Sequence, residues 1–180
     1  ANSIVQVSHL NRISGMFSGQ LVGFTSLYSN IYGYSLSTAE SNGEWNSAYV
    51  GVITNVRHIR KLVPDDKLTI GISKVLEANA IGTLAILMGD VPFSEINNEA
   101  IDDPKFDGQK DVLKSLIALL DEAIADMNAS TGVAAGLKSF DIYFGGNKGK
   151  WIAAAYTLKA RYELVQKNYS GALALSLIPI

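Results

Sequence analysis

The sequence predicts an all-α fold of stacked helical hairpins, and three observations support this prediction. Apolar residues recur with helical spacings of three and four over several long segments. Glycine, proline and asparagine punctuate the ends of these segments, as helix termini require. The two-residue alternation of a β-strand is nowhere comparably clear. We therefore expect helix pairs separated by irregular loop insertions, in one domain over residues 1–180.

Composition limits the classes of function open to the chain. Its 180 residues are 48% hydrophobic and 18% charged, which favours an ordered core over disorder. The net charge is only -2 and the 15 basic residues are scattered, so nucleic acid is not an expected partner. The absence of cysteine excludes disulfides, thiolate metal sites and thiol nucleophiles.

The first long segment, residues 13–36, carries no charged residue. Its polar side chains would be costly in hydrocarbon, so we expect a buried amphipathic helix and not a membrane span. Gly15, Gly19 and Gly23 recur at every fourth position, which predicts a bare helix face that a neighbouring helix can approach closely.

Two further helices are expected to form an antiparallel hairpin. The first begins after residues 41–43, carries an apolar stripe headed by Trp45, and ends at Pro64. The second follows Asp65-Asp66 and ends at Gly89. The connection between them is short, so the two helices should lie side by side.

The rest of the chain alternates loops and helices. An irregular segment runs from Gly89 to Asp107, which we expect to cap a fourth helix over Gln109 to Asn128. A long glycine-containing loop, 129–149, leads into a fifth helix from Lys150 to Lys167, with Trp151 facing the core. A sixth helix follows residues 168–169.

Several short motifs occur in a characteristic order. They are Gly89-Asp90-Val91-Pro92-Phe93, then Pro104 with Phe106-Asp107, and then Asp141-Ile142-Tyr143-Phe144-Gly145-Gly146 leading into Lys150-Trp151. Between about Trp45 and Tyr169 the chain thereby resembles the SusD/RagB family of outer-membrane nutrient-binding lipoproteins. Residues 160–173 also resemble the middle of a tetratricopeptide repeat (TPR), so the expected hairpins are TPR-like.

The resemblance implies a non-enzymatic protein on the cell surface of a Gram-negative bacterium. Such a protein captures a glycan or another small nutrient and delivers it to a SusC-like TonB-dependent transporter in the outer membrane. Family members are longer and carry a lipid anchor on an N-terminal cysteine, so the chain is expected to be a fragment without that anchor and without the C-terminal part of the pattern. No cofactor is implied. Six motif residues are expected to be structural: Gly89, Asp90, Pro92, Trp151, Leu158 and Arg161.

Candidate glycan-binding residues lie where the first helix is expected to end. Sugar recognition needs aromatic rings that offer an apolar face, with polar groups around them. Tyr32 and Tyr34 supply the rings, and Glu40 and Asn42 lie in the polar stretch that follows. The open alternative is that both tyrosines complete the hydrophobic stripe of that helix.

Two other classes of function stay open, a helical-repeat scaffold for a protein or peptide and an α-helical glycoside hydrolase. A hydrolase needs two carboxylates across one cleft, and the only clustered candidates are Glu95, Glu99, Asp102 and Asp103.

Metal and phosphate sites have little support in the sequence. His9 and His58 lack metal-ligand spacing, so no metal site is expected. The run 145–150 resembles a phosphate loop, but no strand precedes it, and we expect a flexible helix entry.

Overall fold

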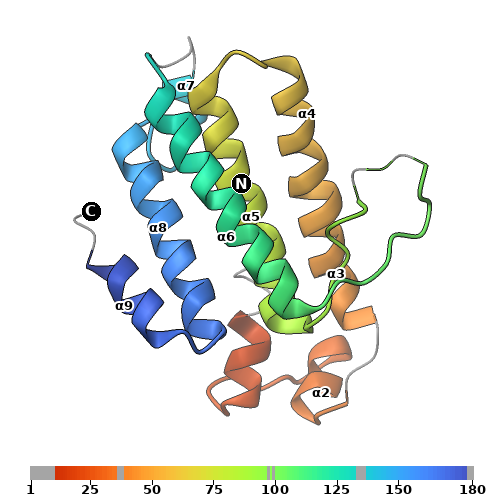
Figure 1. The fold of residues 1–180 in the computed structure, drawn as a ribbon. Helices are drawn as coiled ribbons and strands as arrows, with labels where there is room; N and C mark the ends of the chain where they lie inside the picture. The colour runs from red at the N-terminus through yellow and green to blue at the C-terminus, as the bar shows by residue number, and fades with distance from the viewer. Residues whose placement is uncertain (1–10, 36–38, 97, 99, 133–136, 178–180) are drawn as a thin grey trace. The chain divides into compact units, whose positions relative to one another are not determined.

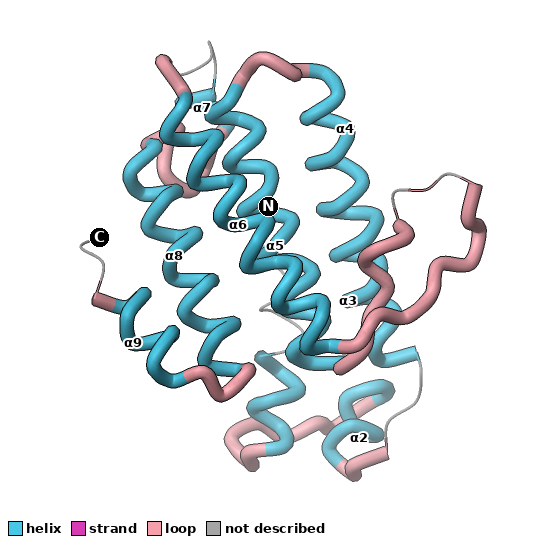
Figure 2. The backbone as a smooth tube through the Cα atoms, viewed as in Figure 1, coloured by secondary structure: helices cyan, strands magenta, loops and turns pink. Residues whose placement is uncertain are grey.

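The computed structural model describes residues 11–35, 39–96, 98, 100–132 and 137–177, which form helices joined by turns and loops (Figures 1 and 2). Within these ranges the strand-type pairing is one isolated antiparallel bridge, between Val91 and Asp107. The predicted all-α class is confirmed. The chain divides into two compact units, Ala1–Val52 and Ile53–Ile180, and the single domain expected over residues 1–180 stays a prediction.

The first unit differs from the sequence prediction. The single helix expected over residues 13–36 is wrong, because residues 11–17 are helical, the chain then turns, and α2 spans Ser26–Tyr32. Gly19 adopts a left-handed φ of 71°, and the Leu21 amide donates back to the Gly15 carbonyl at 2.9 Å. A left-handed glycine ends a helix readily because it lacks a Cβ. The expected glycine face is therefore replaced by a chain reversal.

The second predicted helix is present, but it starts earlier and is interrupted. Helix α3 spans Ala39–Ala48, so residues 41–43 lie inside it and do not cap it. A π-helical turn, η1, covers Tyr49–Ile53, and α4 covers Thr54–Leu62. The predicted end before Pro64 is confirmed.

Helix α5, Lys67–Met88, is central to the second unit. Both of its predicted ends are confirmed, since the Asp66 carboxylate accepts from the Thr69 amide at 3.1 Å and Gly89 has a φ of 88°. It packs against α4, against α6 (Gln109–Ala129) and against α8 (Lys148–Val165). Among the described residues, α5 is the helix long and apolar enough to cross a membrane, but 61% of its apolar window is buried inside the protein, as in a core helix.

The helices of this unit alternate in direction. Figure 1 shows α4, α5, α6 and α8 running up and down beside one another, with α9 (Tyr169–Ser176) packed on α8. The expected loop 129–149 contains one short helix, α7, Leu137–Phe140. The antiparallel pairs agree with the predicted TPR-like stacking.

A missing side chain lets α5 and α8 approach closely. The buried Tyr162 hydroxyl of α8 donates to the Ala78 carbonyl of α5 at 2.6 Å. A Cβ on Gly82 would lie 2.1 Å from the same hydroxyl oxygen, so only glycine leaves room for the ring.

A buried ion pair joins α4 to α5. The Glu77 side chain is only 3% exposed, and it accepts from Arg57 Nε at 2.9 Å and from the guanidinium of Arg60. Both arginines come from α4. The two positive charges compensate for the burial of the carboxylate, which would otherwise be costly.

The loop between α5 and α6 is closed at its base by two carboxylates. The expectation that Asp107 caps α6 is wrong, because Asp107 accepts from the Phe93 amide at 2.9 Å and from the Ser94 amide at 2.7 Å. The first amide of α6, that of Gln109, donates instead to Asp90 at 2.9 Å. Burial alone would raise the pKa of Asp107, but these hydrogen bonds outweigh it and hold the pKa below its ordinary value.

Candidate ligand-binding sites

Tyr34 is an aromatic platform on the first unit. It follows α2 in a left-handed conformation, with a φ of 58°. Its ring is parallel to that of Phe17, at 5.4 Å between centroids and 5° between planes, yet Tyr34 is 72% exposed. Phe17 therefore backs one face of the ring and the other face is open to solvent. The left-handed conformation ends α2, because the Ser35 amide donates back to the Asn30 carbonyl at 2.9 Å.

For the other predicted site residues the structure gives the helix and, for Tyr32 and Asn42, the exposure. Tyr32 is the last residue of α2 and is 44% exposed, whereas its neighbour Ile31 is fully buried. The buried stripe of α2 therefore ends at Ile31. Asn42 is exposed in α3, and Glu40 belongs to the same helix with its side chain outside the described part. Binding by Tyr32, Tyr34, Glu40 and Asn42 stays a prediction.

Sequence reasoning missed the contribution of Phe17. Its spacing predicts a place on the buried stripe of a long first helix, but it is 38% exposed and stacks on Tyr34. The reversal at Gly19 produces this contact, since it brings residues that are 17 positions apart together. Gly19 directly after a helical run was the one available signal of that reversal.

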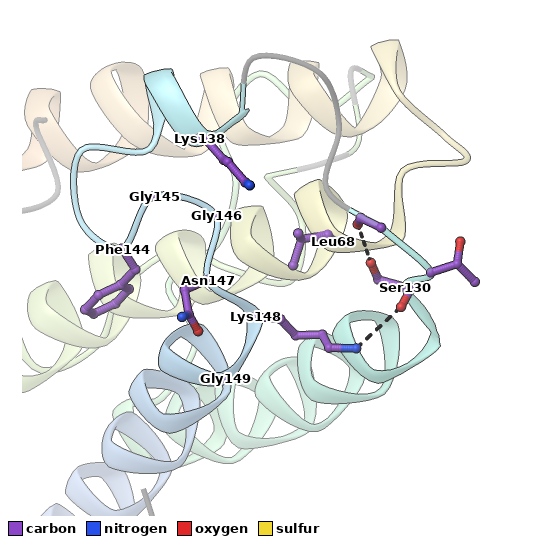
Figure 3. A pocket seen from close by; sticks show the side chains of 11 residues that line it. Leu68, Ser130, Lys138, Phe144, Gly145, Gly146, Asn147, Lys148 and Gly149 are labelled. Atoms are coloured by element: carbon purple, nitrogen blue, oxygen red, sulfur yellow. Dashed lines mark hydrogen bonds between the residues drawn. The ribbon is translucent and has the colours of Figure 1, made fainter.

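A second candidate site is a cavity within the other unit (Figure 3). It has a volume of about 480 Å³, which is within the range of small-molecule sites. Its walls come from the turn after α6, from α7, and from the loop that enters α8. The lining residues are Leu68, Ser130, Thr131, Gly132, Lys138, Phe144, Gly145, Gly146, Asn147, Lys148 and Gly149.

Asp141 fixes one wall of this cavity. Its carboxylate accepts from the amides of Tyr143 at 3.0 Å, Phe144 at 3.2 Å and Gly146 at 2.7 Å, and from the Trp151 indole nitrogen at 2.7 Å. Burial would raise the pKa of Asp141, but the bond from Trp151 and those from the three amides hold it below its ordinary value. These four hydrogen bonds to one carboxylate fix the conformation of the turn formed by residues 141–146.

The helix entry beside the cavity is organised by two further contacts. The Asn147 side chain accepts from the Lys150 amide at 3.1 Å and so caps α8. The Phe144 ring meets Trp151 edge to face at 5.0 Å, and Trp151 is buried as expected. The predicted helix entry over residues 145–150 is present, and its flexibility stays a prediction.

The loop carboxylates considered as hydrolase candidates have different surroundings. Glu95 accepts from the Lys105 amide at 3.0 Å and pairs with its ammonium group at 3.2 Å. Asp102 and Asp103 are exposed, and Glu99 is outside the described residues. Within the described part of the chain, no three His, Cys, Asp or Glu side chains are grouped as metal ligands. His58 is exposed in α4, and His9 is outside the described residues.

The fold and these surfaces define a class, a helical scaffold of stacked pairs with ordered loops that carry candidate sites. The family model for SusD-like proteins, described as starch-binding and associating with the outer membrane, matches residues 2–176. The chain belongs to this SusD-like family. No curated protein sequence matches it.

Solved structures give the same fold. A SusD/RagB family protein from Bacteroides thetaiotaomicron superposes with a TM-score of 0.77 at 22% identity, over 97% of this chain and 42% of that protein. A protein described as chitin-binding gives 0.67 at 25% identity, over 90% and 37%. A chitin-binding SusD homologue from Flavobacterium johnsoniae gives 0.63 at 21% identity, over 90% and 33%. The chain thus spans less than half the length of each of these relatives.

Proposed function

We propose that this chain is the glycan-binding part of a cell-surface nutrient-binding protein. In this role it captures an oligosaccharide at the outer membrane of a Gram-negative bacterium and delivers it to a SusC-like TonB-dependent transporter. The family description supports carbohydrate binding and outer-membrane association, and delivery to the transporter rests on the family resemblance.

The observation that carries the proposal is the Tyr34 platform. A pyranose binds to an aromatic face through its CH groups, and it loses less free energy to ordering when the ring is already fixed. Stacking on Phe17 fixes the Tyr34 ring while most of its surface remains accessible. Tyr32 lies two residues away and is also exposed, so it can extend the apolar surface.

Binding without catalysis is the proposed activity. The described loop acids are either engaged, as Glu95 is with Lys105, or exposed in an irregular segment. A glycosidase requires two carboxyl groups held at a fixed separation across the bond. Oligosaccharides incubated with the protein should therefore be recovered intact by product chromatography.

Calorimetric titration tests the platform. Malto-oligosaccharide and chito-oligosaccharide are the probes, chosen from the family description and from the chitin-binding relatives. Tyr34→Ala should weaken binding by roughly ten- to a hundredfold, because a stacked ring contributes on the order of 1–3 kcal/mol. Tyr32→Ala should weaken it less, and the melting temperature should hardly change.

The chain offers a matched control for these variants. Tyr169 in α9 is 66% exposed, close to the value for Tyr34, so Tyr169→Ala removes a comparable ring at another surface. Its affinity for the probes should equal that of the wild type. Wild-type affinity in both Tyr32→Ala and Tyr34→Ala, for a probe that the unmodified protein binds, would show that the platform is not the site.

A further inference from the structure

The charged side chains that line the cavity beside the start of α8 are all positive. Two of its lining side chains, Lys138 and Lys148, are cationic, and none of the eleven lining residues is acidic. The two lysines come from different elements, α7 and α8. Figure 3 shows the Lys138 side chain pointing from α7 into the space in front of Gly146. A negatively charged group inside this cavity would meet two cations from separate walls.

The cavity is also bounded by a glycine turn. Gly145 and Gly146 have left-handed φ values of 59° and 72°, and with no Cβ their peptide groups form part of the wall. The bonds that Asp141 accepts from this turn hold it in place. The amides of both glycines are already engaged, since Gly145 donates to the Asp141 carbonyl at 3.0 Å and Gly146 donates to the Asp141 carboxylate at 2.7 Å. The turn therefore gives this wall its shape, and the two lysines provide the contacts for an anion.

The opposite wall carries neutral hydrogen-bonding groups. Lys148 reaches across to the Ser130 carbonyl at 3.4 Å, and the Ser130 hydroxyl donates to the Gly132 carbonyl at 2.9 Å (Figure 3). Thr131 lines the space on this side, and Asn147 and the Phe144 ring line it on the side of the loop that enters α8. Hydroxyl and amide groups beside an aromatic ring are the lining that a polyhydroxylated ligand requires.

We propose that this cavity is a second ligand site, which binds a sugar-sized molecule through a carboxylate or other oxyanion placed between Lys138 and Lys148. The site is independent of Tyr34. It gives residues 145–149 a binding role that is based on the cavity and its two cations.

Amide NMR spectra of the whole chain can test this site residue by residue. Glucuronic acid is the charged probe, glucose is its neutral match, and inorganic sulfate is the free oxyanion. Glucuronic acid should shift the amide signals of Gly145, Gly146 and Gly149 saturably, and glucose at the same concentration should not. The affinity should fall as salt is raised, because exposed charges are screened beyond about 8–10 Å near physiological ionic strength.

Lysine variants show whether the two cations are responsible. Lys138→Gln and Lys148→Gln should each weaken glucuronic acid binding about three- to tenfold, the scale of a partly screened charge contact. Lys150→Gln is the matched control, since this lysine is also exposed at the helix entry but does not line the cavity. Tyr34→Ala should leave these shifts unchanged, so this proposal and the platform can fail separately.

Comparing the affinities for sulfate and glucuronic acid distinguishes a free oxyanion from a sugar acid. We expect glucuronic acid to bind more tightly than sulfate. Equal affinity for the two would show that the sugar ring contributes nothing, and it would overturn the sugar-sized ligand in favour of a free oxyanion. The proposal is overturned if glucuronic acid produces no saturable shifts at these glycines. It is equally overturned if glucose matches glucuronic acid or if neither lysine substitution weakens binding.

Discussion

Replacing Asp141 with alanine isolates the contribution of one carboxylate to the fold. In the native structure this side chain accepts four hydrogen bonds, three from backbone amides of its own turn and one from the Trp151 indole at 2.7 Å. The Asp141→Ala variant removes the acceptor of all four hydrogen bonds at once. Its effect depends on which of the four donors water can reach.

The expected loss of stability follows from that difference in access. Trp151 is only 4% exposed, so its indole N–H is left without a partner, which costs about 1–3 kcal/mol. The amides of Tyr143 and Phe144 belong to half-buried residues, where water can replace much of the lost bonding, whereas Gly146 is buried and the loss of its bond adds to the cost. We expect a total loss of about 2–3 kcal/mol. For a chain of this size that corresponds to a fall in melting temperature of about 4–12 °C.

Thermal unfolding followed by circular dichroism measures this loss. Asp103→Ala is the matched control, because Asp103 is an exposed loop carboxylate, and its substitution should change stability by no more than about 0.5 kcal/mol. If Asp141→Ala melts at the wild-type temperature, the carboxylate does not hold this turn and the reasoning is refuted.

The pH dependence of the melting temperatures of the wild type and Asp141→Ala provides an independent check. The pKa of Asp141 in the folded protein is below its ordinary value of 3.8. Its stabilisation is therefore complete above that ordinary value and is lost as pH falls through the lower, folded-state value. The difference in melting temperature between wild type and Asp141→Ala should narrow under strongly acidic conditions. If the difference in melting temperature is the same at every pH, the hydrogen bonds do not depend on an ionised Asp141 carboxylate.

Three further predictions concern residues within the helices. Gly82→Ala should destabilise the protein by about 1–3 kcal/mol, because the new Cβ would lie 2.1 Å from the Tyr162 hydroxyl. Gly43→Ala, inside α3 with nothing within 4 Å of the added carbon, should instead stabilise it by about 0.4–1 kcal/mol; chemical denaturation of both variants compares the two signs. Glu77→Ala should cost about 3–5 kcal/mol, because it leaves two guanidinium groups without their buried partner, and a loss of under 1 kcal/mol in the same assay would contradict that role.

The sequence was sufficient where structure is determined by neighbouring residues. Helix α5 is bounded by Asp66 and Gly89, and both signals act within a few residues of the helix end. The apolar spacing of α6 and α8 likewise predicts which faces are buried, as Trp151 and Tyr162 show. Local hydrogen bonds and helical periodicity are both visible in a single sequence.

The sequence was insufficient where contacts join distant residues. Asp107 has the spacing of a cap for α6, yet Asp90 takes that place from 19 positions away. The apolar spacing of residues 13–31 continues through Gly19, so the reversal there was missed. The pairing of Phe17 with Tyr34 depends on that reversal. Apolar periodicity does not indicate which of two carboxylates accepts from a helix-terminal amide. It also does not indicate at which glycine the chain reverses.

The bridge between Val91 and Asp107 has a consequence for variation of this protein. It closes the intervening loop at its base, with amide-to-carbonyl distances of 3.2 and 3.1 Å, and the closure is made beside the ends of α5 and α6. The free energy of closing a loop grows slowly with length, by about 0.6 kcal/mol per doubling. Residues can therefore be inserted or deleted between these two positions at little thermodynamic cost to the helices. This segment can therefore acquire a new surface while the helical scaffold stays the same.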